Sequence, residues 1–305
     1  MKKMIVSLFA YSLIVLIVFS YTACKREKQE NDSFSVAFLT DIHLQPERDA
    51  VKGFSQALDT VNMLNPDFII TGGDLILDAL AQSYGRADSL NNLFHEVIRR
   101  AKMPVYNTMG NHDIYGINLE KSKADPDHPE YGEKMFEKRF GKSYYSLTHK
   151  GWKFMILNSI ETEDSKNDPY TGKIDSTQIT WIMSELKKTD RSIPIVLSTH
   201  IPFMTVFSQK YWGSTFANDA ELVIYNSKDV LDLFKGYNLK LVLQGHLHIV
   251  EEINIDGIHF ITGGAVSGGW WRGPNRGFGE GFVYVTFKEN DFSWRYVDFG
   301  WDVKK

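Results

Sequence analysis

Polar side chains follow five apolar segments of this chain, at the point where each segment ends. The runs SVAFL, DFIIT, PVYNT, IPIVLS and LKLVL each continue into a short stretch that carries a carboxylate, a carboxamide or an imidazole. Such short apolar runs are typical of buried strands. In open α/β sheets, ligands bind beyond the carboxyl ends of the strands. The five stretches are therefore predicted to converge on one site of an α/β domain.

These stretches together offer seven oxygen or nitrogen donors and no thiolate, a set that suits Mn, Fe or Zn. The donors are Asp41, His43, Asp74, Asn111, His200, His246 and His248. They are too many for one ordinary ion, so the set favours two ions about 3.5–4 Å apart that share one carboxylate. The Asp41/His43 and His246/His248 pairs have the spacing that places two side chains on the same side of an extended segment.

The other histidines do not share this pattern. His95, His128, His149 and His259 follow none of the five strands, and we interpret them as ordinary surface or core residues. An isolated Asp-x-His or Gly-His-x-His would carry little weight. Five such stretches in order, each after a strand, favour a functional site over a structural coincidence.

The remaining pattern predicts two packed sheets flanked by helices in one domain. Apolar residues at helical spacing predict helices over 46–64, 88–102 and 174–188, the last with its N-cap at Asp175 or Ser176. Ile179, Ile182, Met183 and Leu186 would form its buried face. Four runs over 250–255, 258–262, 282–288 and 292–298 predict antiparallel hairpins. A long polar excursion over 110–141 suggests a functional loop or small subdomain.

The N-terminal segment has the features of a delivery signal. Lys2 and Lys3 precede 17 almost wholly apolar residues, and Cys24, the single cysteine, follows Ala23. Residues 1–23 are predicted to be an export signal, 24–33 a tether and 34–305 the folded domain. The stretch Tyr21-Thr22-Ala23-Cys24 resembles a bacterial lipoprotein box, so we expect an exported lipoprotein held at the membrane by its N-terminus. A secreted or N-terminally anchored protein is the alternative.

Composition excludes several other classes of protein. A lone cysteine rules out an intramolecular disulfide framework and any Cys-rich zinc module. The net charge is −4, from 34 basic and 38 acidic residues, and no basic run is long enough to bind a phosphate backbone. Nucleic acid is therefore not an expected partner, whereas a small-molecule phosphoester is. The oligomeric state is left open.

With these residues in place, the chain resembles the calcineurin-like metallophosphoesterase family, in its bacterial cyclic-nucleotide phosphodiesterase-like branch. The matching blocks are Asp41-Ile42-His43, Gly72-Gly73-Asp74, Gly110-Asn111-His112-Asp113, His200 and Gly245-His246-Leu247-His248. The resemblance implies a four-layered α/β/β/α sandwich, with two mixed sheets and a dinuclear metal site at the strand ends. Leu75 follows Asp74 where purple acid phosphatases place a tyrosine ligand, so an Fe–tyrosinate centre is not expected.

The resemblance also implies a role for each site residue. One metal would take Asp41, His43 and His248, the other Asn111, His200 and His246, and Asp74 would bridge them. His112 would contact the phosphate and protonate the leaving oxygen, oriented by Asp113 or by Asp78.

The implied activity is hydrolysis of a phosphodiester or phosphomonoester. Two divalent or trivalent ions would lower the pKa of a bridging water, and the resulting hydroxide would attack phosphorus directly. The alternatives are a pyrophosphatase acting on nucleotide-sugar or lipid diphosphates, and a catalytically silent metal-bearing binding protein.

Three loops are expected to rim the site, over 161–172, 203–216 and 263–281. The third is rich in glycine and carries Trp271, Arg272 and Arg276. We expect the tryptophan to stack on a base or sugar, and an arginine to bind a second phosphate.

Overall fold

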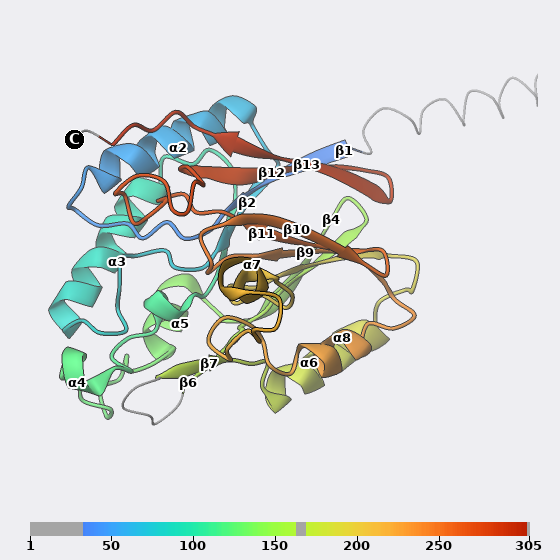
Figure 1. The fold of residues 1–305 in the computed structure, drawn as a ribbon, viewed down its shortest axis with the longest axis horizontal. Helices are drawn as coiled ribbons and strands as arrows, with labels where there is room; N and C mark the ends of the chain where they lie inside the picture. Colours follow the sequence, from blue (N-terminus) through green and yellow to red (C-terminus); the bar gives the residue numbers. More distant parts are fainter. Residues whose placement is uncertain (1–32, 163–168, 304–305) are drawn as a thin grey trace, which may run out of the picture.

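The computed structural model describes residues 33–162 and 169–303 (Figure 1). The predicted export signal over 1–23, the lipoprotein box with Cys24 and residues 24–32 of the predicted tether lie outside the described residues. Within the described ranges, no helix has the length and apolar character needed to cross a membrane.

The first sheet has five strands in the order β13, β12, β1, β2, β3. β2 runs parallel to both β1 and β3, whereas β12 pairs antiparallel with β1 and β13. The strands are β1 (Ser33–Leu39), β2 (Phe68–Gly72), β3 (Val105–Thr108), β12 (Gly281–Lys288) and β13 (Asp291–Asp298). The last hairpin of the chain therefore completes the sheet that the first described strand begins.

The second sheet has six strands in the order β10, β11, β9, β8, β5, β4. Its four inner strands run parallel, and its two edge strands pair antiparallel with their neighbours. The strands are β4 (Tyr145–His149), β5 (Trp152–Ile156), β8 (Pro194–Ser198), β9 (Asn238–Gln244), β10 (Val250–Ile255) and β11 (Ile258–Gly263). The two hairpins predicted over 250–262 and 282–298 are confirmed: β10 and β11 pair in this sheet, and β12 and β13 pair in the first.

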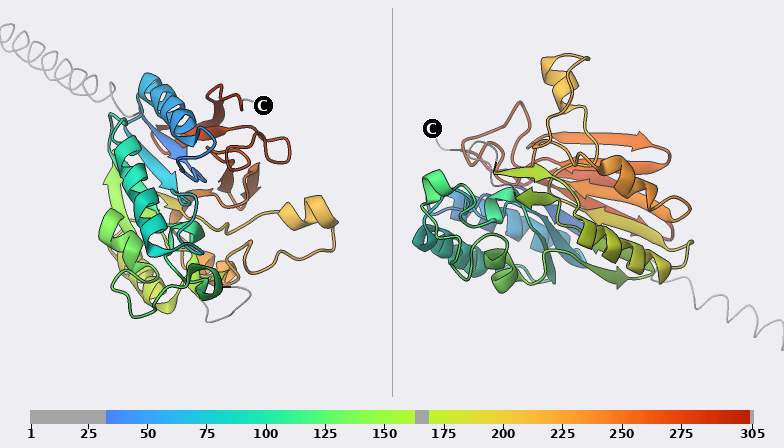
Figure 2. Two further views of the ribbon diagram at one scale, coloured as in Figure 1. Left: turned by 90° about the vertical axis from the view of Figure 1, so that its left-hand side faces the viewer. Right: turned by 90° about the horizontal axis from the view of Figure 1, so that it is seen from below.

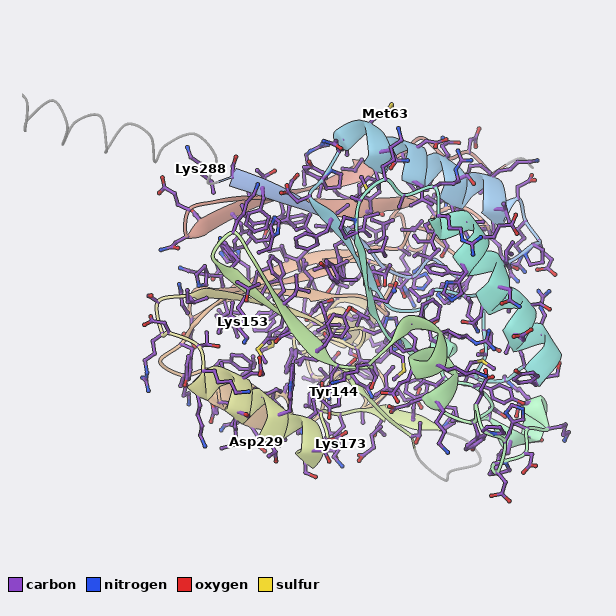
Figure 3. All side chains as sticks on the ribbon, turned by 180° about the vertical axis from the view of Figure 1, so that it is seen from behind. Met63, Tyr144, Lys153, Lys173, Asp229 and Lys288 are labelled. Carbon is purple, nitrogen blue, oxygen red and sulfur yellow. The ribbon has the colours of Figure 1, made fainter. Side chains whose placement is uncertain are left out.

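The two sheets pack face to face over an apolar core. Because successive side chains of a strand point to opposite faces, Phe34, Val36 and Phe38 of β1 all enter this core. There the Phe34 ring stacks on Phe287 of β12 with 4.6 Å between centroids. Figure 3 shows side chains filling the space between the sheets, while Met63 points away from the body and is 78% exposed.

Helices cover the outer face of each sheet and complete the four layers (Figures 1 and 2). α2 (Ala50–Leu64) and α3 (Tyr84–Ile98) lie on the first sheet, and α6 (Ser176–Lys187) and α8 (Ser227–Asp232) on the second. The α/β/β/α sandwich with two mixed sheets is confirmed. α2 begins four residues later than predicted, because Arg48 and Asp49 have left-handed backbone angles.

The buried face of α6 differs in part from the prediction. Asp175 is its N-cap and accepts a hydrogen bond from the Gln178 amide at 2.7 Å. Ile182 and Leu186 are buried as expected, but Met183 is 43% exposed. Gln178 is buried on this face of the helix instead. Its side chain accepts a hydrogen bond from the Asn158 amide and donates one to the Asn158 carbonyl.

The loops contain short elements that the sequence pattern did not indicate. The excursion over 110–141 contains the 3-10 turn η1 (Asn111–Asp113), α4 (Leu119–Ser122) and α5 (Lys134–Phe140). The two ends of the loop predicted over 161–172 pair as a small sheet of β6 (Ile160–Thr162) and β7 (Tyr170–Gly172). The loop after β8 carries α7 (Phe207–Trp212), which stands away from the body in Figure 2.

Candidate metal centre

All seven predicted donors lie just beyond the carboxyl ends of five parallel strands. β1, β2 and β3 of the first sheet lead into Asp41, Asp74 and Asn111. β8 and β9 of the second sheet lead into His200 and His246. The site therefore lies where the ends of the two sheets meet, and each sheet supplies part of it.

Left-handed backbone angles, and not an extended segment, bring the paired donors together. Asp41 and His43 have φ of 55° and 45°, and His246 and His248 have φ of 71° and 52°. The expectation of extended Asp-x-His and His-x-His segments was therefore wrong. Asp74 shares this conformation, with φ of 53°. Residues other than glycine rarely adopt it, and such strain concentrates at functional sites.

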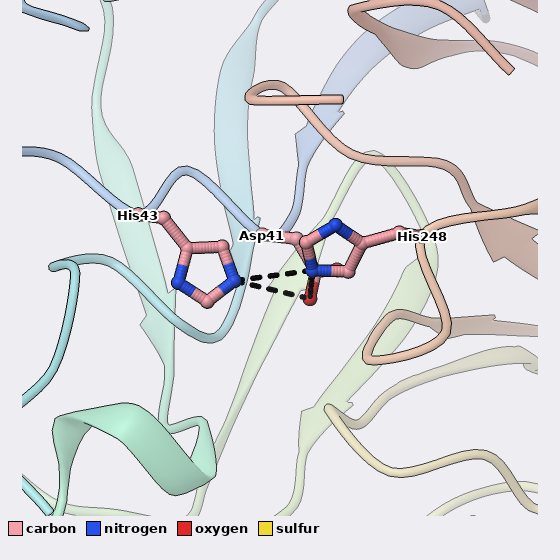
Figure 4. Close-up of side chains that lie close together, drawn as sticks. All are labelled: Asp41, His43 and His248. Atoms are coloured by element: carbon pink, nitrogen blue, oxygen red, sulfur yellow. Dashed lines mark hydrogen bonds and ion pairs between the residues drawn. The ribbon is translucent and has the colours of Figure 1, made fainter. Parts of the chain in front are cut away.

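The first group of donors is Asp41, His43 and His248, shown in Figure 4. His248 Nε2 lies 3.2 Å from Asp41 Oδ1 and 3.1 Å from His43 Nε2. His43 Nε2 lies 4.0 Å from the same Asp41 oxygen. All three side chains are buried, and their three ligand atoms face one another.

The second group is Asp74, His200 and His246. His200 Nε2 lies 3.2 Å from both Asp74 Oδ2 and His246 Nδ1, and 3.0 Å from Asn111 Oδ1. Asp74 Oδ2 also lies 3.5 Å from His43 Nε2 of the first group. One carboxylate oxygen thus stands between the two groups, in the position of a bridging ligand.

The hydrogen bonds around the imidazoles aim their free nitrogens inward. The Nδ1 atoms of His200 and His248 donate to the carbonyls of Gly72 and Gly268, at 2.8 and 2.6 Å. A neutral imidazole that donates from Nδ1 has only a lone pair at Nε2. The second nitrogen of a metal-binding histidine is commonly held by such an acceptor.

The donor set fits two cations. His43 Nε2 and His248 Nε2 lie 3.1 Å apart, and a cation between them would stabilise this arrangement once both nitrogens are deprotonated. Asp41 Oδ1 is buried and accepts no hydrogen bond from the described residues, although buried carboxylate oxygens normally do. Oxygen and nitrogen donors in two groups, joined by Asp74, are the ligands that a two-metal site uses.

The electrostatics keep two of the imidazoles neutral. Burial lowers the pKa of His43 to about 3, and burial together with His200 lowers the pKa of His246 to about 4. Burial would raise the pKa of Asp74, but His200 and the other nearby imidazoles outweigh it and hold that pKa well below its usual range. Burial lowers the pKa values of His200 and His248 too, but Asp74 raises that of His200 to about 9 and Asp41 raises that of His248 above its usual value. A bound ion would displace the protons from these two imidazoles, because neutral imidazoles and an ionised carboxylate are the forms that bind metal.

Asp78, and not Asp113, is the carboxylate that contacts His112. Asp78 Oδ1 lies 3.2 Å from His112 Nδ1. Asp113 instead accepts hydrogen bonds from the amides of Gly110 and Leu75, both at 2.9 Å, and so ties two ligand-bearing loops together. Of the two residues that the sequence left open for orienting His112, the geometry selects Asp78.

His112 lies at the mouth of the site. Its side chain is 30% exposed, and its ring centroid lies 5.1 Å from that of His43. Burial lowers its pKa, but the carboxylates of Asp74 and Asp78 outweigh that effect and raise the pKa to about 9. A protonated imidazole held beside the metal-ligand groups can donate a proton to a leaving oxygen.

The predicted substrate contacts are only partly compatible with the structure. Trp271 is 1% exposed and donates from Nε1 to the Ile42 carbonyl, so it has no face to offer a ligand, and that prediction was wrong. The Arg276 guanidinium lies over the Tyr211 ring at 4.3 Å. Arg272 lines a hollow of about 330 Å³ with Arg48, Trp271 and Trp301.

Two residues near the ligands, Trp270 and Thr40, are not among the predicted site residues. Trp270 lies against His248, with 4.4 Å between ring centroids, and is 39% exposed. The Gly-Trp-Trp sequence indicated an aromatic at this place but not which of the two faces the site. The Thr40 hydroxyl donates to Asp41 Oδ2 at 2.6 Å. Its position before Asp41 was the only available signal.

The fold and the site together define a class of protein, the two-metal hydrolases of phosphoesters. The sequence profile of the calcineurin-like phosphoesterase family matches residues 34–250. The chain therefore belongs to the calcineurin-like phosphoesterase family, and it is a metal-dependent hydrolase of phosphoric esters. The family and the two donor groups indicate a dinuclear site for divalent ions.

Similar proteins agree with this assignment. The chain is 28% identical over 236 residues to a 3',5'-cyclic-nucleotide phosphodiesterase of Nostoc sp. strain PCC 7120, covering 74% of this chain and 76% of that protein. It is 25% identical over 245 residues to a probable cyclic nucleotide phosphodiesterase of Fibrobacter succinogenes, covering 76% and 79%. A dimetal phosphatase from Danio rerio shares the fold, with a TM-score of 0.60, 13% identity and coverage of 86% and 95%.

Proposed function

We propose that the protein hydrolyses the phosphodiester bond of 3',5'-cyclic nucleotides. The observation that carries the proposal is the sharing of Asp74 Oδ2 between two donor groups, with His112 beside them. The names of the two similar phosphodiesterases support the substrate class. A phosphodiester has a poor alkoxide leaving group, which needs a proton, and His112 is placed to supply one.

The residues have distinct tasks in this reaction. Asp41, Asp74, Asn111 and the four histidines His43, His200, His246 and His248 would hold the two ions. When bound, the ions supply charge that stabilises the phosphoryl oxygens and activates water. Water adds to phosphorus, one ester bond breaks, and the leaving oxygen takes a proton from His112. Asp78 holds His112 through Nδ1, which leaves Nε2 as the atom that delivers the proton.

We further propose that the two ions are chosen from Mn, Fe and Zn. Imidazole and carboxylate donors accept all three, and no thiolate is present to favour a softer ion. The supply of metal where the protein works would then decide between them.

Metal loading followed by a substrate panel tests the proposal. The full chain, stripped of metal, is reloaded separately with Mn, Fe and Zn and assayed on 3',5'-cyclic AMP, bis(p-nitrophenyl) phosphate, p-nitrophenyl phosphate and a nucleotide-sugar diphosphate. We expect cyclic AMP hydrolysis that requires metal and is lost in Asp74→Asn and His112→Ala.

Two results would overturn it. Faster cleavage of the diphosphate than of any phosphodiester would make the protein a pyrophosphatase. Two bound ions without turnover of any substrate would make it a binding protein.

A further inference from the structure

Trp270 forms part of the wall beside the first donor group. Its ring centroid lies 4.4 Å from that of His248 and 5.6 Å from that of His43, with the planes inclined at 32° and 45°. Both imidazoles are buried, whereas Trp270 is 39% exposed. An indole surface is therefore open to solvent directly next to the atoms that would hold an ion.

The backbone that presents this indole is unusual. Trp270 and Trp271 both have positive φ, 56° and 64°. Bulky residues rarely adopt this conformation, and it persists only where surrounding structure enforces it. The Trp271 amide donates to the Ser267 carbonyl at 2.7 Å, which fixes the turn. An observed strain of this kind, beside a reactive centre, points to a function for the displayed side chain.

The turn is also fastened to the backbone that carries the metal ligands. The Ser267 hydroxyl donates to the Asp41 carbonyl at 2.8 Å, and Trp271 Nε1 to the Ile42 carbonyl at 2.9 Å. Arg48 donates to the Trp270 carbonyl at 3.1 Å. The Trp271 ring packs so closely on Gly53 of α2 that no side chain would fit there. Trp270 is therefore held at a fixed place relative to Asp41 and His43.

We propose that Trp270 is a specificity-determining residue on which the base of a nucleotide stacks while its phosphate lies at the ions. The inference rests on the proposed function, because it assigns the part of the substrate that lies beyond the scissile phosphate. Every base has a π face, so an exposed indole binds bases without a particular hydrogen-bonding pattern. A merely structural Trp270, which only orients His248, is the competing explanation.

Inhibition by two ligands that differ only in the base separates these explanations. The holoenzyme hydrolyses bis(p-nitrophenyl) phosphate, and inhibition constants are measured for AMP and for ribose 5-phosphate. Stacking of one base would make AMP bind roughly tenfold tighter or more. Trp270→Leu should remove that advantage and leave the constant for ribose 5-phosphate unchanged, while Trp270→Tyr should retain most of it.

The matched control is Trp181→Leu. Trp181 lies in α6, on the outer face of the second sheet, and packs on Tyr144, so the same substitution is made at a tryptophan remote from the site. It should leave both inhibition constants unchanged. Metal content is measured for every variant, because loss of His248 orientation would lower it.

The outcomes are distinct. Equal weakening of AMP and ribose 5-phosphate in Trp270→Leu, with less bound metal, would assign Trp270 a structural role and overturn the inference, as would unchanged constants for both. If the wild type cleaves bis(p-nitrophenyl) phosphate but no cyclic nucleotide, the proposed function fails. The inhibitor comparison still decides the role of Trp270 in that case.

Discussion

His112 Nδ1 lies 3.2 Å from Asp78 Oδ1, although Asp113 is the next residue along the chain. Asp113 is turned away and accepts the amides of Gly110 and Leu75. The two carboxylates therefore have different tasks. Asp78 sets the orientation and charge of an imidazole at the mouth of the site, and Asp113 holds the loops that carry the ligands.

Asp78→Asn should lower kcat and move the pH profile. His112 acts as an acid, so activity is present below its pKa, which is about 9, and is lost as pH rises through it. Removing the Asp78 charge lowers that pKa, so the alkaline loss should begin at lower pH. We expect a kcat roughly tenfold lower, less than the roughly 10²–10⁴-fold loss for His112→Ala. An unchanged profile in Asp78→Asn would contradict this role.

Asp74→Asn should remove bound metal as well as activity. The substitution weakens the one carboxylate that faces both donor groups. We expect fewer than two ions per chain by elemental analysis, and a loss of activity beyond the roughly 10–100-fold that changes to outer-shell partners cause. Asp232→Asn, on the exposed surface of α8, is the control and should keep both ions. Two retained ions in Asp74→Asn would argue against a bridging carboxylate.

Removal of metal should lower the melting temperature. The ligand atoms of the first group lie close together, with His43 Nε2 3.1 Å from His248 Nε2, and five ligand residues have strained backbone angles, so bound ions would stabilise this arrangement. Ions at about 100 times their Kd contribute about 2.7 kcal/mol. For a domain of this size that corresponds to roughly 5–10 °C. The shift in melting temperature is measured by comparing melting curves recorded with a chelator and after metal has been added back. Identical curves would refute the expectation.

Gly110→Ala should damage stability and activity together. A Cβ at this position would overlap the amide nitrogen and Oδ1 of Asp74, both of which are fixed. We expect a loss of about 1–3 kcal/mol in the free energy of unfolding, as for other overpacked sites. Gly85→Ala is the matched control, because no atom outside its own helix lies within 4 Å of the added Cβ. That variant should be neutral or slightly more stable. Equal behaviour of the two would exclude the steric explanation.

Glu185→Gln should show a stability cost that depends on pH. The Glu185 carboxylate accepts Lys153 Nζ at 2.7 Å and the Ser146 hydroxyl at 2.8 Å, and these bonds, the Lys153 bond foremost, lower its pKa to about 2. A depressed pKa gives stability above the unfolded value of 4.5, which is lost as pH falls toward 2.

At pH 7 the Glu185→Gln variant should be less stable by about 1–2 kcal/mol in urea unfolding. Solvent screens a partly buried ion pair, so its contribution to stability is smaller than the free energy that corresponds to the full pKa shift. The difference should shrink between pH 4.5 and pH 3. Glu96→Gln, on the exposed face of α3, should match the wild type at every pH. A constant difference across the pH range would contradict the ion-pair explanation.

The layered fold and the grouping of the donors could be predicted because the end of each buried strand is marked by residues that are neighbours in the sequence. A buried strand is a run of apolar residues, and the polar stretch that follows each run is visible without tertiary information. Asp41 and His200 are 159 positions apart in sequence, yet each is marked by its own strand.

The features of the site that depend on turn geometry could not be predicted from the sequence pattern. The alternation of Asp41 and His43 suggested an extended segment, whereas both residues have left-handed backbone angles. The same conformation at Trp270 and Trp271 decides which indole is buried, and no spacing rule predicts that choice. Asp78 contacts His112 from 34 residues away, while the adjacent Asp113 does not.

The pairing of β1 with β12 has a consequence for synthesis of the chain. β1 is the first described strand, and one of its edges stays open until residues 281–288 have been made. His248 must also emerge before the first donor group is complete. A nascent chain on the ribosome therefore carries most of its strands before it can close the first sheet or assemble its metal ligands. Because the first donor group needs His248, the growing polypeptide lacks a complete set of metal ligands until that residue has been made.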